Sequence, residues 1–215
     1  MVVCADFVLD FCSEKMLKGW AEDKSNLKTP DELLDTYIQC YNDSIKNHVG
    51  KMHIGLHICR GIFCFAPFGA HLTSHTGNFM GSRHFSEGGY DRIAIKLFQT
   101  LNVSTYYLEY DTARAGTFEP LLHLPAHKNV ILGVITSKFP ELEDKGKMKE
   151  RVYAAAEIVA KGSGQTKEEA LKRLGVSPQC GFASHEEGNL LGWEDMKNKL
   201  ALVRSIADDI WPGEP

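Results

Sequence analysis

NVILGVITS, at residues 129–137, is apolar over nearly its whole length, which is typical of a strand buried on both faces of a parallel sheet. Two further stretches have strand character: MHIGLHIC at 52–59, where apolar residues alternate with His and Gly, and NVSTYYLEY at 102–110, which is rich in β-branched and aromatic residues. LGVSPQ at 174–179 is a weaker candidate, and residues 1–5 are expected to be the remnant of a fifth strand.

Helical stretches separate these strands. In TPDE at 29–32, Thr29 has the character of an N-cap, Pro30 suits the first helical position, and Glu32 completes a capping box. Apolar residues at helical spacing predict three longer helices, over 90–101, 141–159 and 193–211. A shorter helix is expected at 166–173, reached through flexible glycines at 162 and 164, and the tryptophans at 193 and 211 are expected in the core.

The alternation of strands and helices predicts βαβ units, hence an α/β fold with a parallel sheet. The 215 residues approach the roughly 200 at which a (β/α)8 barrel can close. Four or five strands supply only about half of such a barrel, so we expect one domain over 1–215 that forms its C-terminal portion. Residues 62–87, rich in Gly and His and without periodicity, are expected to be a long loop insertion.

Composition excludes several classes of protein. The chain has 24 Lys and Arg against 28 Asp and Glu, a formal net charge of −4, and 43% hydrophobic residues. These values exclude a disordered or collagen-like chain and argue against nucleic-acid partners. No stretch approaches the ~18 apolar residues of a membrane span, and the first residues lack the basic segment of a signal peptide. Six scattered cysteines without disulfide spacing favour free thiols and a cytoplasmic protein.

Four residues that can bind a metal follow or end the predicted strands. His57 and Cys59 share one face at the end of their strand, Glu109 ends the next, and Cys180 follows the last. Each has a plain structural alternative: a buried His beside an apolar Cys, an ion pair of Glu109 with Arg114, and an inert Cys180. Active sites of parallel α/β folds form at these strand ends, and together the four offer nitrogen, sulfur and oxygen ligands to a tetrahedral Zn²⁺. Ligands on separate strands favour catalysis over support of folding.

Five segments carry a resemblance to a known family: GLHICRG (55–61), FSEGGYDRIAIKLFQTLNV (85–103), YYLEYDTARAGTFEPL (106–121), VILGVITSKFPELE (130–143) and SPQCGFAS (177–184). They resemble the C-terminal part of the cobalamin-independent methionine synthase family, over most of residues 52–211. The resemblance implies a (β/α)8 barrel in which His57, Cys59, Glu109 and Cys180 hold zinc.

The sequence departs from that family in two ways. Glu109 lies five residues before Arg114, whereas methionine synthases have the acidic ligand closer to the corresponding Arg, a spacing that Asp111 matches better. We prefer Glu109 for its LEY context and keep Asp111 as the alternative, and also as a candidate substrate-binding residue. The N-terminal half of the family's barrel has no counterpart here, so an acidic residue for the ammonium of an amino acid would fall on Asp6.

The resemblance implies a methyltransferase. In that reaction the zinc-bound thiolate of homocysteine attacks the N5-methyl group of a polyglutamyl methyltetrahydrofolate and forms methionine. Two alternatives stay open: a truncated, non-catalytic zinc-binding barrel fragment, and a sister enzyme that alkylates a different thiol. The expected partners are a small-molecule thiol and methyl-folate, not nucleic acid or membrane. An open half-barrel also exposes strand edges and apolar faces, which predicts self-association.

Overall fold

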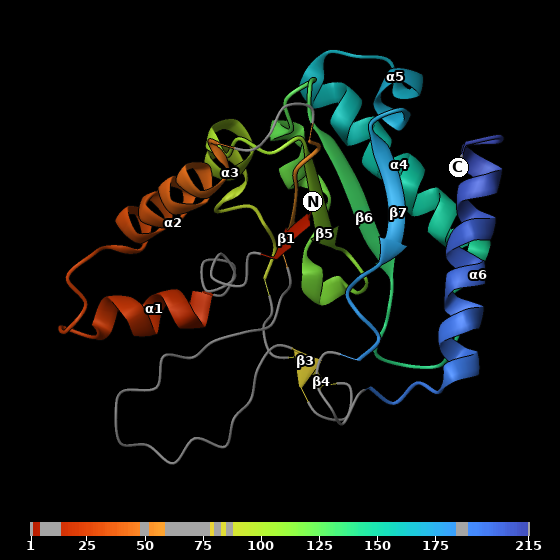
Figure 1. Cartoon of the computed structure of the whole chain (residues 1–215), viewed down its shortest axis with the longest axis horizontal. Coiled ribbons are helices and arrows are strands. Elements are labelled where there is room, and N and C mark those ends of the chain that lie inside the picture. Colours follow the sequence, from red (N-terminus) through yellow and green to blue (C-terminus); the bar gives the residue numbers. More distant parts are fainter. Residues whose placement is uncertain are drawn as a thin grey trace.

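The computed structural model describes residues 2–4, 14–47, 52–58, 78–79, 83–84, 88–183 and 189–214. At its centre lies a five-stranded, wholly parallel sheet in the order β1-β2-β5-β6-β7 (Figure 1). Its strands are β1 (Val2–Cys4), β2 (Gly55–Ile58), β5 (Thr105–Glu109), β6 (Asn129–Ile135) and β7 (Leu174–Pro178). The strands predicted from the sequence are therefore confirmed, in chain order, together with the α/β class.

Helices connect these strands, and one more follows the last strand (Figure 1). They are α1 (Glu14–Glu22), α2 (Pro30–Ile45), α3 (Ala94–Thr100), α4 (Lys145–Ser163), α5 (Lys167–Leu171) and α6 (Trp193–Ile210), with short 3-10 helices at Ala113–Ala115 and Glu119–His123. The sequence did not predict α1, and α3 begins at Ala94 rather than at residue 90. None of the helices in the described part of the chain combines the length and the apolar character needed to cross a membrane.

The start of α2 follows from its capping box. The Thr29 hydroxyl accepts a hydrogen bond from the Glu32 backbone N–H at 3.3 Å, and the Glu32 carboxylate accepts one from the Thr29 N–H at 2.8 Å. Pro30 occupies the first turn, where its missing N–H costs nothing. The helix start predicted from TPDE is confirmed.

The helix predicted over 141–159 is present but shifted: α4 begins and ends four residues later than expected. α4 begins after Asp144, whose carboxylate accepts a hydrogen bond at 2.8 Å from the backbone N–H three residues further on. It ends at Gly164, which has a positive φ of 67°. The expected flexible connection is therefore wrong at Gly162, which is helical. Glycine is required there because a Cβ would overlap the carbonyl oxygen of Leu122.

The two faces of the sheet differ, and this difference positions the candidate site. Leu56, Tyr106 and Val130, in one row across three strands, are buried in the hydrophobic core. The next row along the strands, on the opposite face, contains His57, Tyr107, Ile131 and Gly175. Two rows further, and so on this same face, lie Glu109, Gly133 and Ser177. Strand alternation therefore places His57 and Glu109 on one face, which we call the inner face.

The expected loop insertion falls largely outside the described residues, and one of the two tryptophans expected in the core does not lie there. Within 62–87 the structure describes only β3 (Asn78–Phe79) and β4 (Arg83–His84), which pair antiparallel. The long insertion and the single domain over 1–215 stay predictions. Trp193 is 70% exposed rather than in the core, whereas Trp211 packs against the core and donates to the Leu171 carbonyl at 3.0 Å.

Candidate metal centre

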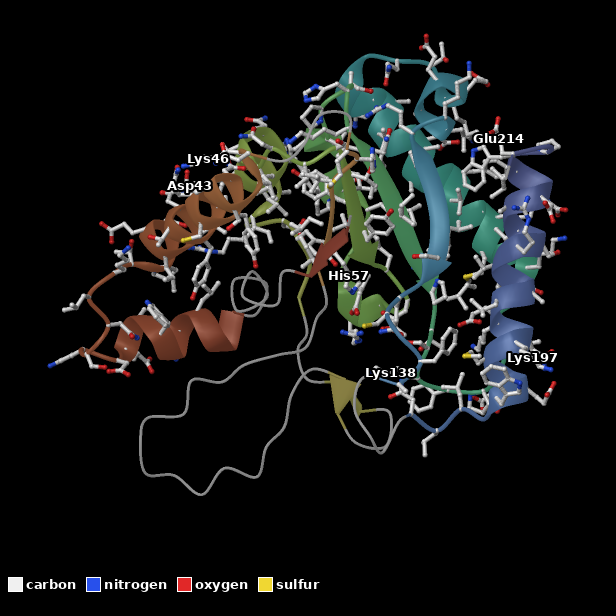
Figure 2. The ribbon with its side chains drawn as sticks, in the orientation of Figure 1. Asp43, Lys46, His57, Lys138, Lys197 and Glu214 are labelled. Carbon is white, nitrogen blue, oxygen red and sulfur yellow. The ribbon has the colours of Figure 1, made fainter. Side chains whose placement is uncertain are left out.

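His57 lies toward the C-terminal end of β2, on the inner face, at the end of the sheet that also carries Lys138 after β6 (Figure 2). Its Nε2 atom is buried and has no hydrogen-bond partner among the described residues. Burial alone would lower the pKa of His57. A hydrogen bond with Cys180 and the charges of Cys180 and Glu109 outweigh burial, so the pKa is raised.

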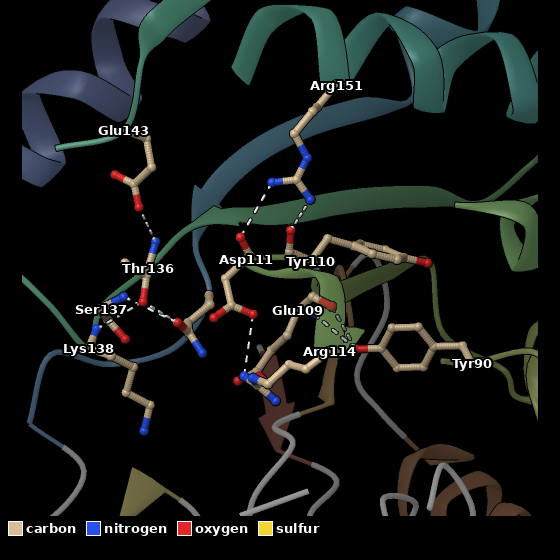
Figure 3. Close-up of polar contacts among 11 residues, drawn as sticks. Tyr90, Glu109, Tyr110, Asp111, Arg114, Thr136, Ser137, Lys138, Glu143 and Arg151 are labelled. Carbon is tan, nitrogen blue, oxygen red and sulfur yellow. Dashed lines mark hydrogen bonds and ion pairs between the residues drawn. The ribbon is translucent and has the colours of Figure 1, made fainter. Parts of the chain in front are cut away.

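Glu109 is the last residue of β5 and is 1% exposed. One carboxylate oxygen, Oε2, lies 3.4 Å from a guanidinium nitrogen of Arg114, and the other, Oε1, is buried without a hydrogen-bond partner among the described residues (Figure 3). Burial raises the pKa of Glu109 to about 7. The charges of Cys180 and Asp111 add to this rise in pKa, while Arg114 and His57 oppose it.

Cys180 follows β7 and is half-buried. The preceding residue, Gln179, is buried and fixes the chain here: its backbone N–H donates to the Ile135 carbonyl at 2.8 Å. Its side-chain oxygen accepts hydrogen bonds from the Thr136 hydroxyl at 2.8 Å and from the Ser137 backbone N–H at 3.4 Å. These bonds attach the end of β7 to the segment that follows β6 and thereby position the Cys180 thiol.

Three of the four predicted ligands come together at these strand ends. His57, Glu109 and Cys180 each offer one ligand atom, and these atoms lie within 4.8 Å of one another. Two ligand atoms of a tetrahedral Zn²⁺ at about 2.3 Å lie about 3.8 Å apart, so the limit of 4.8 Å is about 1 Å wider than the spacing in a zinc-loaded site. A cavity of about 250 Å³ opens beside them; His57 and Cys180 contribute to its lining, as do Tyr107, Leu108 and Pro178.

The donor set fits a metal ion. Buried polar atoms without a partner are rare because each loses its hydration, yet this cluster contains two, His57 Nε2 and Glu109 Oε1. A nitrogen, a thiol and a carboxylate are ligands that Zn²⁺ accepts, and the thiol disfavours Mg²⁺ and Ca²⁺. The described residues thus offer three candidate ligands at the ends of three strands.

Other predicted site residues lie elsewhere. Cys59 and Asp6 lie outside the described residues, so their roles stay predictions. Asp111 does not belong to the three-residue group; its buried carboxylate pairs with Arg114 at 3.3 Å. The geometry therefore places Glu109, rather than Asp111, beside His57, while a role for Asp111 in substrate binding stays a prediction.

The surroundings include residues that the sequence did not single out (Figure 3). Arg151 of α4 donates to the backbone carbonyls of Tyr110 and Asp111, and its guanidinium lies 5.6 Å from the centre of the Phe118 ring. Tyr90 contacts the backbone of Glu109 through its hydroxyl group. No local pattern signals such contacts, since they join segments about 20 to 40 residues apart.

Comparison with known proteins links this geometry to solved structures. No protein-family model matches the chain. A protein from Listeria monocytogenes, assigned as a vitamin-B12-independent methionine synthase, superposes with a TM-score of 0.60 and 28% identity, over 99% of this chain and 48% of its own. A B12-independent methionine synthase from Shewanella sp. W3-18-1 gives a TM-score of 0.52 at 20% identity, and the match covers 84% of this chain and 44% of the synthase. The fold is that of part of such a synthase.

This fold confirms the expected portion of a TIM-type barrel, made of parallel strands. Two sequence relatives are the uncharacterized Bacillus subtilis proteins YxjG, 38% identical over 202 residues, and YxjH, 36% identical over 183 residues. They match 94% and 85% of this chain. The chain spans 46% and 41% of their lengths, and so less than half of each relative.

Proposed function

We propose that this chain uses His57, Cys59, Glu109 and Cys180 to hold Zn²⁺ and thereby activates a small thiol for methylation. The observation that carries the proposal is the convergence of three ligand atoms from the ends of three strands, two of them buried without a hydrogen-bond partner in the described part of the chain. The methionine synthase fold supports the same chemistry. Cys59 enters by its place in the sequence, two residues after His57.

The metal supplies thiol activation: a thiol of pKa about 8.5 binds Zn²⁺ as the thiolate, which is the nucleophilic form. The acceptor we propose is homocysteine, and the donor is a polyglutamyl 5-methyltetrahydrofolate. The sulfur–carbon bond forms as the N5–methyl bond breaks, and N5 takes up a proton. The products are methionine and tetrahydrofolate.

The chain's own residues prepare the site for that reaction. Tyr107 and Pro178 line the cavity beside His57 and Cys180 with apolar surface, which limits hydration of a bound sulfur. Arg114 offsets part of the negative charge of Glu109, so the carboxylate and the Cys180 thiolate can lie close together.

The metal content of the purified full chain tests the proposal. We expect about one Zn²⁺ per chain by elemental analysis, and a loss of zinc in His57→Ala and Cys180→Ser. Cys40→Ser is the matched control, because Cys40 is also a free thiol but lies exposed on α2. Zinc that is absent from the wild-type chain, or retained in both ligand variants, would refute the metal centre.

The reaction is tested separately on the zinc-loaded chain with homocysteine and 5-methyltetrahydrofolate. Formation of methionine supports the proposed methyl transfer. If added thiols leave the zinc coordination unchanged in X-ray absorption spectra, the alternative of a non-catalytic zinc-binding protein holds instead. If another thiol is alkylated and homocysteine is not, the chain is a sister enzyme with a different acceptor.

A further inference from the structure

The backbone of Glu109 is bound by a side chain in addition to its pairing with Gly133 of β6. The Tyr90 hydroxyl accepts a hydrogen bond from the Glu109 N–H at 3.0 Å and contacts the Glu109 carbonyl at 3.4 Å as a donor (Figure 3). One phenol therefore bridges both backbone polar groups of Glu109.

Tyr90 is itself held firmly. It is fully buried, its ring lies edge-on to that of Tyr110 at 5.4 Å, and its carbonyl accepts a hydrogen bond from Ala94 at 2.8 Å as α3 begins. These contacts leave the phenol little freedom to move away from the last residue of β5.

The segment that carries Tyr90 is joined to the segment that carries Arg114. The Gly88 N–H donates to the Arg114 carbonyl at 3.0 Å. Gly89 packs so closely on Gly116 that a Cβ on Gly116 would lie 2.7 Å from the Gly89 Cα. Because Gly116 also has a positive φ of 75°, a side chain there would be strained as well as crowded. The two segments thus form one unit around Glu109.

We propose that Tyr90 is a positioning residue of the metal centre: together with Arg114, it fixes Glu109 so that its carboxylate stays beside His57 and Cys180. Tyr90 holds the backbone of Glu109, and Arg114 holds one oxygen of its carboxylate. Groups that orient a metal ligand in this way contribute strongly to metal affinity. This inference rests on the proposed function, because it requires Glu109 to be a ligand.

The test compares Tyr90→Phe with Tyr106→Phe in the full chain, by Co²⁺ titration followed through visible absorption. Tyr106 is a matched control: it is also fully buried, and its hydroxyl also donates to a backbone carbonyl, that of Leu97 at 2.9 Å, but it faces α3. We expect Tyr90→Phe to weaken Co²⁺ binding by about 10- to 100-fold and to change the ligand-field spectrum. Tyr106→Phe should bind as the wild type does, although both variants lose a buried hydrogen bond.

Each other outcome overturns the inference. Wild-type affinity and spectrum in Tyr90→Phe, or equal weakening in both variants, means that the hydroxyl contributes only to folding. If Tyr90→Phe fails to fold, Arg114→Lys takes its place, because lysine keeps the positive charge but lacks the planar guanidinium that can contact two carboxylates. We expect this variant to bind Co²⁺ more weakly. Unchanged binding would refute the proposal that Tyr90 and Arg114 together fix Glu109. A wild-type chain that binds neither Co²⁺ nor Zn²⁺ refutes the proposed function and this inference together.

Discussion

Glu109 makes the stability of the metal-free chain depend on pH. Its folded-state pKa is about 7, against 4.5 for a solvated Glu, chiefly because of burial. A raised carboxyl pKa means that the folded state binds more protons between these values, so its contribution to stability is complete below pH 4.5 and lost as the pH rises through about 7. We expect the free energy of unfolding to fall by up to about 3 kcal/mol over that window in chelator-treated protein, measured by urea denaturation.

Glu109→Gln tests this effect, because the amide has a similar shape and cannot ionise; it also removes a charge that helps to raise the pKa of His57. His57 also has a raised pKa and adds a slope of the same sign, so the informative quantity is the difference between the two proteins. We expect the variant to be less sensitive to pH and more stable than the wild type above pH 7. Parallel profiles for the two proteins would mean that Glu109 ionises as freely as an exposed residue.

Arg114 stabilises two buried carboxylates at once. Its guanidinium lies 3.4 Å from Glu109 and 3.3 Å from Asp111, and all three side chains are at most 10% exposed. Arg114→Met leaves these acidic groups without that cation, and breaking a buried ion pair in this way costs about 3–5 kcal/mol. Urea denaturation of the metal-free variant at pH 8 measures the loss.

The control for Arg114 is Arg204→Met on α6, where Arg204 pairs with Asp208 on the surface. An exposed pair contributes little, since water and salt screen it, and we expect almost no change in its unfolding curve. If both variants lost equal stability, the Arg114 pairing would be no more important than a surface contact.

At the scale of the elements, the close approach of β6 and β7 depends on Gly133. A Cβ at Gly133 would lie 2.8 Å from the Gln179 Cα and 3.0 Å from the Leu108 carbonyl oxygen. The register between the two strands shifts here, so that Ser177 is opposite Gly133 and Pro178 is opposite Ile135. We expect Gly133→Ala to push the end of β7 outward, to destabilise the chain by about 1–3 kcal/mol and to weaken zinc binding through displacement of Cys180.

Gly181→Ala tests whether that loss is specific. Gly181 directly follows Cys180, but a Cβ there meets nothing within 4 Å and its φ is not positive. The added methyl group should leave both the unfolding midpoint and the zinc affinity nearly unchanged. Equal losses in the two variants would show that any added bulk near Cys180 is harmful, whatever the contact between the strands.

Strand periodicity explains why part of this site was predictable from sequence. The alternation in MHIGLHIC placed His57 on the face opposite the buried Leu56 and Ile58, as the structure has it. Periodicity did not decide between Glu109 and Asp111, which share a face if the strand continues; the spacing to Arg114 favoured Asp111 and the LEY context favoured Glu109. β5 ends at Glu109, and Asp111 therefore turns toward Arg114.

The remaining features depend on contacts between distant segments, which periodicity does not reveal. Tyr90 reaches Glu109 across 19 residues, and only the packing of the loop before α3 against β5 brings them together. In α4, Gly162 has a sequence typical of a flexible connection, but the helix continues because the glycine allows close packing against Leu122. Both residues are fixed by tertiary contacts rather than by local preference.

On the scale of the whole molecule, the described sheet is open. Within the described residues no strand pairs with the outer edge of β1 or of β7. Four exposed apolar residues lie near the end of the sheet that carries the candidate metal centre. They belong to two segments, one around Ser137 and the other around the start of α6. A hydrogen bond of 2.8 Å from the Asn189 side chain to the Ser137 carbonyl joins these two segments. These residues, which we call the apolar patch, are Phe139, Leu142, Leu190 and Trp193.

An open sheet edge and an apolar patch both favour contact with another polypeptide, so we expect the chain to self-associate in a concentration-dependent way. Sedimentation velocity over a wide range of concentration measures this association.

The apolar patch is tested by substitution. Trp193→Glu should weaken the association by about 2 kcal/mol, since Trp193 is 70% exposed and a large aromatic side chain contributes strongly to an interface. Leu27→Glu is the control, because Leu27 is 97% exposed but lies in the connection from α1 to α2, outside the patch. A single monomeric species at every concentration would contradict self-association, and equal effects of the two variants would exclude the patch as its surface.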